Sequence, residues 1–418
     1  MKLPLFLSQR SFWSTFLGNL FEHYDTALFS LLSPYLAPLI FPNHDPLTAL
    51  ILTYGMIPLG MLARPIGALV FGYIGDVYGR QQALFLTLAG MSLISVIIAL
   101  SPTYQQIGIW APIIFCLGRV FQNFLSSGES MGGAVFILEH TQEKKHDLLG
   151  SLYSSSTLGG ILLASAALSL FSFFWQIEQI WRWFYVLGCS TAIFGCSLRY
   201  QQLPKNKERL SFQPLSFFKG LWMYKKAVLL IAMVAGFSYA SYSVALVLTN
   251  GFIPLVTNIT KIQMLHLNTI LLILDFCSLP FFGWLCSKIQ REKMMLLAST
   301  TIMISSIPLF FLLNQASFCL VIIIRIFFVL LGVAFFAPFH AWAQRLVPAE
   351  YRYRVISFGY ALGSQVFGGP TSSLSLWFFK NTNRIESIGY YWFVLACLTT
   401  YVLNYTLKNK TILSEKSS

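Results

Sequence analysis

Long apolar stretches separated by short polar segments run along the whole chain. A membrane-spanning helix needs about 20 mostly apolar residues, and twelve stretches meet this requirement. They cover residues 12–40, 47–74, 82–100, 107–138, 148–173 and 182–203 in the first half, and 226–254, 265–287, 294–313, 317–344, 355–379 and 388–406 in the second. The charge-free segment Met294–Ile324 is too long for one helix, so we divide it at Asn314-Gln315. The pattern predicts an all-α membrane protein with twelve transmembrane helices.

Composition points to the same class of protein. Hydrophobic residues make up 56% of the 418 positions and charged residues only 10%, a balance that soluble domains do not show. The first apolar stretch is far longer than the hydrophobic region of a signal peptide and contains Glu22, His23 and Asp25, so we expect no cleavage. The seven cysteines and six histidines form no metal-ligand spacing. We therefore expect neither a metal nor a cofactor.

The distribution of basic residues predicts the orientation, because lysine and arginine stay on the cytoplasmic side. With both termini cytoplasmic, most basic residues fall in cytoplasmic segments, and the opposite face keeps only Arg182, Lys261, Lys380 and Arg384. The formal net charge of +13 then reflects topology. We expect a multi-pass protein in a lipid bilayer and no nucleic-acid partner, which would need a solvated basic domain.

Two parts of the chain repeat each other, which indicates a duplication. Gly72, Asp76 and Arg80 in GYIGDVYGR are matched at a constant offset by residues of GWLCSKIQR, namely Gly283, Ser287 and Arg291. Arg119 is similarly echoed by Arg325 in the fourth span of each half. We expect two pseudo-symmetric six-helix bundles, over residues 1–203 and 226–407, with a cytoplasmic linker at 204–225 and a short cytoplasmic tail at 408–418.

Ionisable residues inside the predicted spans are the candidate functional residues, because such groups are costly in lipid and tend to face a cavity or a partner. Placed by helical rise, they lie near the midplane: Glu22, Asp25, Arg64, Arg119, Glu129 and Asp275. Glu22 and Asp25 share one helix face, where two carboxylates at low dielectric favour one of them holding a proton near neutral pH. A proton-coupled carrier requires such a group.

A structural interpretation of these charges stays open. Glu22 and Asp25 could remain ionised and pair with Arg64 or Arg119 to hold helices together, and the protein would then be a uniporter. Arg64 and Glu129 suit a structural pair as well as a substrate contact. The guanidinium of Arg119 suits two hydrogen bonds to a carboxylate.

The segment GYIGDVYGR lies at the cytoplasmic membrane boundary and is a candidate gating loop. Asp76 and Arg80 can brace helix ends through charge-assisted hydrogen bonds, and Gly72 and Gly79 allow close backbone approach. Ordinary solvation of a loop is the alternative. Three aromatic residues near the charged layer, Tyr24, Tyr239 and Tyr242, could enclose a quaternary ammonium group or simply pack.

Several strings together resemble a known family. LGNLFEHYDTALFS (Leu17–Ser30), ARPIGALVFGYIGDVYGRQ (Ala63–Gln81), SGESMGGAVFILEHTQEKK (Ser127–Lys145) and WRW (Trp181–Trp183) are similar to the metabolite:proton symporters of the major facilitator superfamily, and most of all to bacterial proline/betaine transporters. The likeness is strong over residues 17–200. In the second half VPAEYRYRVISFGYALG (Val347–Gly363) is the clearest match.

This resemblance implies alternating access between two bundles, with substrate and proton sharing a central cavity. It implies proton or substrate binding by Glu22 and Asp25, a loop lock at Asp76 and Arg80, and acidic fourth-span positions at Glu129 and Glu139. It also implies a monomer in a bacterial inner membrane.

The chain departs from the family pattern at several positions. Asn123 stands where the family tends to have glycine after R-x-x-Q, Ser127 replaces the first glycine of GGE, and Gln81 replaces a basic residue. The second-half loop has Ser287 instead of aspartate and Gln290 instead of glycine, so we do not expect a symmetric lock there.

The sequence therefore predicts proton-coupled import of a small zwitterion such as proline or glycine betaine. A dicarboxylate such as 2-oxoglutarate is the alternative, with Arg64 and Arg119 gripping its two carboxylates. A membrane enzyme or receptor would need a catalytic constellation or a large extramembrane domain, and the sequence shows neither, so we do not expect an enzyme.

Overall fold

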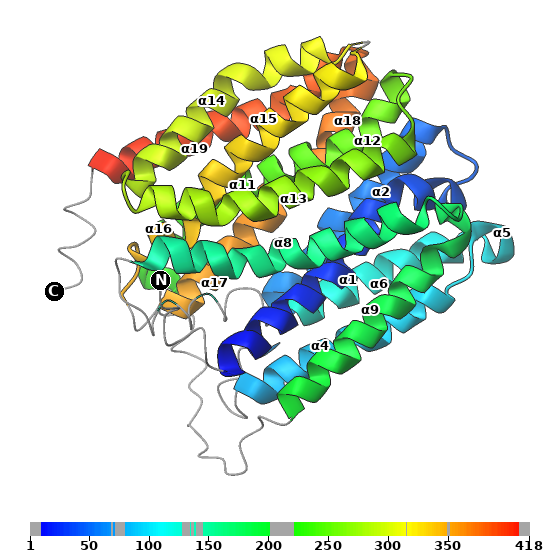
Figure 1. Ribbon diagram of the computed structural model, residues 1–418, viewed down its shortest axis with the longest axis horizontal. Helices are drawn as coiled ribbons and strands as arrows, with labels where there is room; N and C mark the ends of the chain where they lie inside the picture. The colour runs from blue at the N-terminus through cyan, green and yellow to red at the C-terminus, as the bar shows by residue number, and fades with distance from the viewer. Residues whose placement is uncertain are drawn as a thin grey trace.

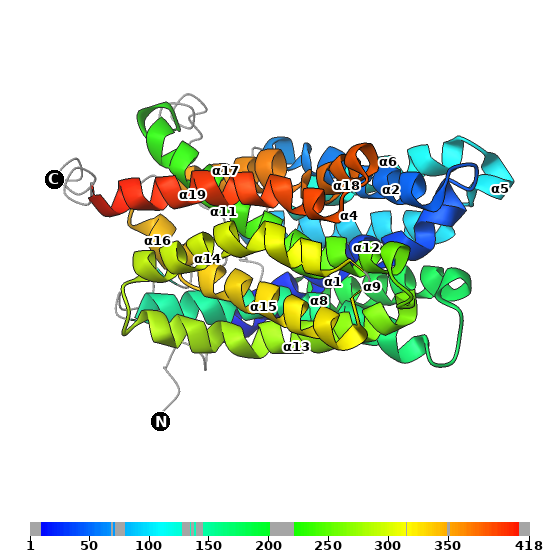
Figure 2. The same cartoon turned by 90° about the horizontal axis from the view of Figure 1, so that it is seen from above.

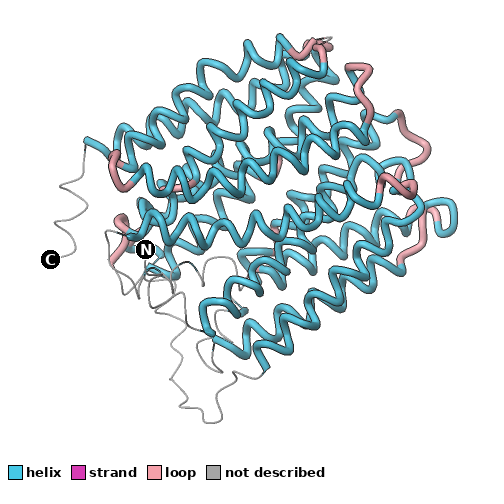
Figure 3. Tube along the Cα trace, in the orientation of Figure 1, coloured by secondary structure: helices cyan, strands magenta, loops and turns pink. Residues whose placement is uncertain are grey.

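The structure is a computed structural model that describes residues 10–67, 70–71, 80–127, 134, 138, 145–200, 221–314, 316–348 and 352–408. Within these ranges the side chains of residues 10–15, 80–85, 190–200 and 352–354 are not described. The described part of the chain consists of helices and short connections and contains no strand (Figure 3).

The first half forms helices over nearly all of its predicted spans. They are α1 (Arg10–Ile40), α2 (Pro46–Met61), α4 (Arg80–Leu100), α5 (Tyr104–Ile107), α6 (Trp110–Ser126), α8 (His146–Phe171) and α9 (Ile177–Tyr200) (Figure 1). The four-residue helix α5 precedes α6 and is separated from it by Gly108 and Ile109; the positive φ of 60° at Gly108 suits glycine.

The second half is interrupted more often. It contains α11 (Lys225–Tyr242), η3 (Ser243–Leu248), α12 (Thr249–Val256), α13 (Lys261–Cys286), α14 (Arg291–Leu312), α15 (Phe318–Phe336), α16 (Phe339–Gln344), α17 (Arg352–Gly363), η4 (Ser364–Gly368), α18 (Thr371–Thr382), η5 (Ile385–Gly389) and α19 (Tyr390–Lys408). Both η3 and η4 are π-helical turns inside otherwise continuous spans. Such turns occur often at functional sites.

The helices agree with the hydropathy pattern. Each of the twelve predicted spans coincides with at least one helix of the described chain, and α14 ends at Leu312 while α15 begins at Phe318, which confirms the division at Asn314. Six helical segments of the described residues are long and apolar enough to cross a membrane: Pro46–Gly67, His146–Phe171, Lys225–Val256, Lys261–Cys286, Arg291–Leu312 and Phe318–Gln344. The protein is an all-α membrane protein.

The helices form two groups that follow chain order. In the first group α1 packs on α8 and α9, while α4 packs on α6 and α9. In the second group α11 packs on α17, and α14 packs on α15 and α19. The two groups meet where α8 lies along α13 and where α2 lies along α18 (Figure 2).

Small residues let the two groups approach closely. A Cβ atom on Gly283 of α13 would lie only 2.1 Å from Ser151 Oγ of α8. A Cβ atom on Gly251 of α12 would lie 2.5 Å from Tyr54 Oη of α2. No side chain fits at either place without displacing a neighbour, so these glycines set the separation of the two groups.

Candidate functional site

A cavity of about 140 Å³ lies between the two groups of helices. The first half lines it with residues of α1, of the helical turn that follows α2, and of α8, and the second half lines it with residues of α11, η3, α13, α15 and α17. Its polar and aromatic lining includes His23, Arg64, Tyr239, Tyr242, Asp275 and Tyr360. The cavity therefore contains two of the ionisable residues that the sequence places at the midplane, one from each half.

Arg64 contributes the positive charge of the cavity. The α-helix α2 ends at Met61, and a further helical turn begins at Arg64 itself. Arg64 Nε donates a hydrogen bond to Asn123 Oδ1 of α6 at 2.9 Å. Neither Nη nitrogen has a hydrogen bond or ion pair with any described residue, so no described group competes with a ligand for them.

Asp275 contributes the negative charge. It lies in the middle of α13, lines the cavity and is 7% exposed. Its carboxylate forms no hydrogen bond or ion pair with the residues that the structure describes. A buried carboxylate without a partner is unfavourable, so a proton or a cationic ligand would stabilise this position.

Arg64 and Asp275 occupy equivalent positions in the two halves. They are 211 residues apart, as are Gly72 and Gly283, so the duplication that relates the two loops also relates these two charges. One ancestral position thus carries opposite charges in the two halves. The sequence contained this relation, and the constant offset of the glycine motif could have revealed it.

Aromatic side chains of the second half cover one side of the cavity. The rings of Tyr239 and Tyr242 in α11 have centroids 6.3 Å apart and planes inclined by 56°, and Phe336 and Tyr360 also line the cavity. Tyr24 does not line it. The Tyr24 hydroxyl donates to the Phe184 carbonyl at 3.3 Å, and the side chain packs inside the first half.

Asp25 and Arg119 belong to a separate buried network in the first half. Ser95 Oγ lies 2.6 Å from each carboxylate oxygen of Asp25, and Gln122 Nε2 donates to Oδ2 at 3.0 Å. Arg119 Nη1 donates to Gln122 Oε1 at 2.8 Å. Gln122 therefore links Asp25 to Arg119 without a direct ion pair. The carboxylate of Glu22 is buried near the network, one turn before Asp25 on α1.

The arginine that echoes Arg119 is bound differently. Arg325 in α15 is fully buried and donates from Nη2 to the Ala245 carbonyl of η3 at 3.0 Å and to Asn268 Oδ1 at 2.5 Å. The π-helical turn frees carbonyl groups from the regular helix pattern. The second half thus uses its arginine to hold an irregular helix segment, and it has no aspartate in the place of Asp25.

Several predicted site residues lie outside the described residues: Gly72, Asp76, Gly79, Glu129 and Glu139. Arg80 begins α4, but its side chain is not described. Within the described residues no group of three His, Cys, Asp or Glu side chains is arranged to hold a metal ion.

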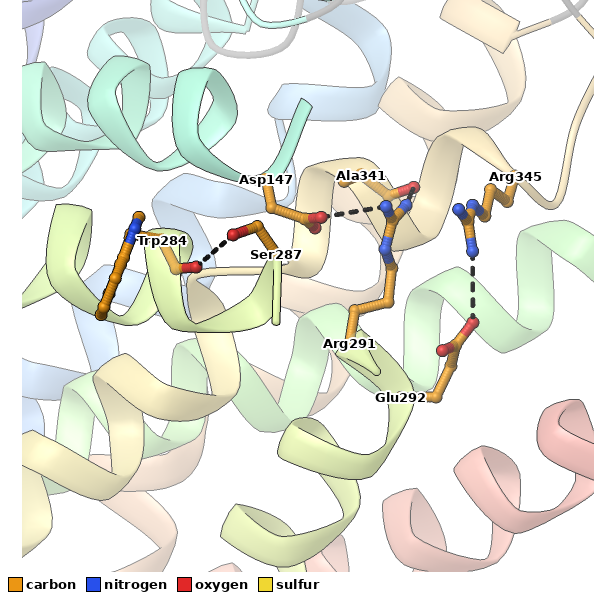
Figure 4. A network of polar contacts seen from close by, with 7 residues as sticks. All are labelled: Asp147, Trp284, Ser287, Arg291, Glu292, Ala341 and Arg345. Carbon is orange, nitrogen blue, oxygen red and sulfur yellow. Dashed lines mark hydrogen bonds and ion pairs between the residues drawn. The ribbon is translucent and has the colours of Figure 1, made fainter. Parts of the chain in front are cut away.

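An ion pair joins the two halves at the predicted cytoplasmic end (Figure 4). Arg291 at the start of α14 contacts Asp147 Oδ2 of α8 at 2.9 Å, and its Nη1 donates to the Ala341 carbonyl of α16 at 3.0 Å. Ser287, at the position of the missing aspartate, only donates to the Trp284 carbonyl of its own helix. The partner of the second-half arginine therefore comes from the other half, which the sequence comparison of the two loops did not predict.

Contacts also join the halves at the predicted external end. Lys380 Nζ of α18 lies 2.5 Å from Thr48 Oγ1 and 4.0 Å from Asp45 Oδ2 at the start of α2. Lys261 Nζ of α13 donates to the Pro34 carbonyl of α1 at 3.0 Å. Two of the four basic residues predicted on this face thus bridge the halves. The charged cavity lies between these two sets of contacts.

Two pseudo-symmetric helical halves that meet around a charged cavity, with contacts between the halves at both ends, define a membrane transporter. The chain matches the sequence profile of the Major Facilitator Superfamily over residues 12–371, and it belongs to this superfamily. It is a transporter and not an enzyme.

Relatives and solved structures agree with this assignment. The "Putative proline/betaine transporter" of Staphylococcus haemolyticus (strain JCSC1435) is 29% identical over 407 residues, which cover 92% of this chain and 84% of the relative. The alpha-ketoglutarate permease of Escherichia coli (strain K12) is 27% identical over 410 residues, covering 94% and 92%. The proton:xylose symporter XylE bound to 6-bromo-6-deoxy-D-glucose shares the fold, with a TM-score of 0.73 at 15% identity over 96% of this chain and 95% of that chain. The resemblance to proline/betaine transporters is confirmed.

Proposed function

We propose that this transporter imports a small zwitterion, such as proline or glycine betaine, together with a proton. It would work as a monomer in a bacterial inner membrane, with both termini cytoplasmic. The observation that carries the proposal is the cavity itself, because Arg64 and Asp275 face it from opposite halves and neither has an ionic partner among the described residues.

A zwitterion suits both charges at once. Its carboxylate would accept hydrogen bonds from the Nη groups of Arg64, and its ammonium group would lie at Asp275. Tyr239 and Tyr242 offer ring faces beside the cavity, which suits a methylated or secondary ammonium ion through cation–π attraction. The ligand would thereby contact both halves and supply each cavity charge with a partner that the described residues do not provide.

A dicarboxylate suits the cavity less well, although the Escherichia coli relative is named for one. Its second carboxylate would meet Asp275, and like charges at low dielectric repel strongly. The arginine that a dicarboxylate would need as a second grip, Arg119, is absent from the cavity lining and bonds to Gln122. The described lining therefore favours a ligand with one positive and one negative group.

Asp25 is the residue we propose for proton coupling, with Glu22 as its neighbour one turn earlier. Asp25 is 4% exposed and receives hydrogen bonds from Ser95 and Gln122. Protonation would weaken the hydrogen bond from Gln122 Nε2 to Asp25 and would thereby loosen the link that Gln122 forms between Asp25 and Arg119. In this way one proton can rearrange contacts among α1, α4 and α6.

Transport assays in proteoliposomes test the proposal. We expect uptake of labelled proline or glycine betaine, but not of 2-oxoglutarate, to rise when a proton gradient is imposed. Asp275→Asn and Arg64→Gln should each weaken zwitterion binding about tenfold or more, because a hydrogen bond to a charged group contributes roughly 1.5–3 kcal/mol. Glu178→Gln and Arg384→Gln likewise replace a carboxylate and a guanidinium by amides, but at exposed positions, and should have no effect.

The assays can also contradict the proposal. Strong 2-oxoglutarate uptake that survives Asp275→Asn would favour the dicarboxylate alternative. Zwitterion uptake that ignores both the gradient and Asp25→Asn would indicate a uniporter whose buried acids are structural.

A further inference from the structure

Asn123 is a buried amide at a close contact between α2 and α6. Its side chain is 2% exposed, and it lies against Gly60, where a Cβ atom would come within 2.9 Å of Asn123 Nδ2. A Cβ atom on Gly67 would lie 2.0 Å from the Phe124 carbonyl, so the two helices stay close from Gly60 to Gly67. Asn123 is therefore confined and has little freedom to change rotamer.

The hydrogen bonds of Asn123 fix the orientation of its amide group. Asn123 Nδ2 donates to the Arg119 carbonyl at 2.9 Å, and Oδ1 accepts from Arg64 Nε at 2.9 Å. The reversed amide would place its oxygen against the Arg119 carbonyl oxygen and its NH₂ group against the Arg64 donor, which removes both bonds. The backbone of α6 thus dictates that an acceptor faces Arg64.

This contact decides how Arg64 can hold an anion. A guanidinium group binds a carboxylate through a pair of parallel N–H groups, either Nε with one Nη or the two Nη groups together. Asn123 occupies Nε, so only the end formed by the two Nη groups remains for a bidentate carboxylate. No hydrogen bond or ion pair to the described residues occupies that end.

We propose that Asn123 is a positioning residue that holds the Arg64 guanidinium in place so that its two Nη groups receive the substrate carboxylate. The inference rests on the proposed function, because it assigns the orientation of a group in the same cavity. Asn123 does not line the cavity and acts through Arg64. It contributes to affinity because a guanidinium held in advance loses less rotamer freedom when the ligand binds.

A double-mutant cycle with paired ligands tests the proposal. Dissociation constants are measured for glycine betaine and proline, and for choline and prolinol, which keep the ammonium group but lack the carboxylate. The variants are Asn123→Ala, Asn123→Leu, which preserves more of the volume, Arg64→Ala, and the two double variants. Thermal unfolding of each purified protein shows which variants are folded. The test needs only one Asn123 variant that is folded.

The expected result is a loss that is selective for the carboxylate. Each Asn123 variant should raise the Kd of glycine betaine and proline about tenfold, equivalent to ~1.4 kcal/mol, and change the Kd of choline and prolinol less than twofold. In the Arg64→Ala background the Asn123 variants should have no further effect, because residues that act through each other are not additive.

Other outcomes overturn the proposal in distinguishable ways. An equal loss for choline and prolinol, or an undiminished loss in the Arg64→Ala background, would make Asn123 a packing residue only. Unchanged Kd values in both Asn123 variants would reject its role while leaving the proposed function intact, provided that Arg64→Ala still weakens carboxylate binding. If wild-type protein binds none of the four ligands, the proposed function and this inference both fail.

Discussion

Arg291 should control the opening of the predicted cytoplasmic end. Its side chain is 8% exposed and that of Asp147 is 5% exposed, so the pair that joins the two halves is largely withdrawn from water. Asp147 Oδ1 has no hydrogen bond, and Oδ2 contacts only Arg291 among the described side chains. Arg291→Gln therefore leaves a buried carboxylate whose main counter-charge is gone.

The magnitude follows from the burial of the pair. Removing one partner of a buried ion pair costs roughly 3 kcal/mol or more. Opening the predicted cytoplasmic end would separate α8 from α14 and let water reach Asp147, so the cost applies to the closed state and not to the open state. A difference of ~3 kcal/mol shifts a two-state equilibrium by roughly a hundredfold. We expect Arg291→Gln to favour the open state by about this factor.

Distances between spin labels on the two halves measure this shift. Lys145 beside α8 and Lys288 after α13 are exposed and can each be replaced by cysteine in a protein whose seven native cysteines have been removed. Arg291→Gln should move the distance distribution toward longer values. The double variant Asp147→Asn/Arg291→Gln should return toward the wild-type distribution, because it removes the isolated carboxylate. The reasoning is refuted if Arg291→Gln leaves the distribution unchanged or if the double variant opens as widely.

Three smaller perturbations follow from other contacts. Lys380→Gln should shift the equilibrium toward an open external end by only about 1 kcal/mol or less, because Lys380 and Asp45 are 46% and 58% exposed. Spin labels across that end should show a small, salt-sensitive change in distance. Hydrogen bonds from the Thr48 side chain and backbone hold the pKa of Asp45 below its usual range. The contact between Lys380 and Asp45 should therefore persist at neutral pH and weaken only when acid protonates Asp45. Distances between the same labels, measured as the pH is lowered, would report this change. Gly60→Ala should displace the Asn123 amide, since the new Cβ would lie 2.9 Å from Asn123 Nδ2. The variant should weaken glycine betaine binding more than choline binding. Equal weakening of both would contradict the role of Asn123.

The fold could be predicted because hydrophobicity and length determine which segments cross the membrane. The division between α14 and α15 is an example, since a charge-free stretch of that length exceeds what one bilayer crossing needs, and the structure ends one helix at Leu312 and starts the next at Phe318. The π-helical turn at η3 could not be predicted in this way. Its sequence SVALVL is as apolar as a regular helix, and the turn depends on contacts such as Arg325 with the Ala245 carbonyl.

The candidate site could be predicted only in part, because the position of a charge along a span gives its depth and not the direction it faces. Arg64 and Arg119 lie at similar depths in their predicted spans, yet Arg64 lines the cavity while Arg119 bonds to Gln122 inside the first half. The Asp147–Arg291 pair joins residues 144 positions apart in different halves. No local pattern connects them, and only the packing of α8 against the second half brings them together.

Opposite charges at equivalent positions give the cavity a physical reason to respond to its ligand. Among the described residues, Asp275 has no partner that compensates its burial, and the Nη groups of Arg64 have no hydrogen-bond acceptor. A zwitterion supplies both partners in one molecule and attaches one end to each half, so its binding free energy can offset the cost of breaking contacts at one end of the molecule. A ligand with a single charge could satisfy only one half, and it would bind without drawing the two halves together. Transport should therefore require both charged groups of the substrate, and a compound such as choline should bind weakly and inhibit without being carried.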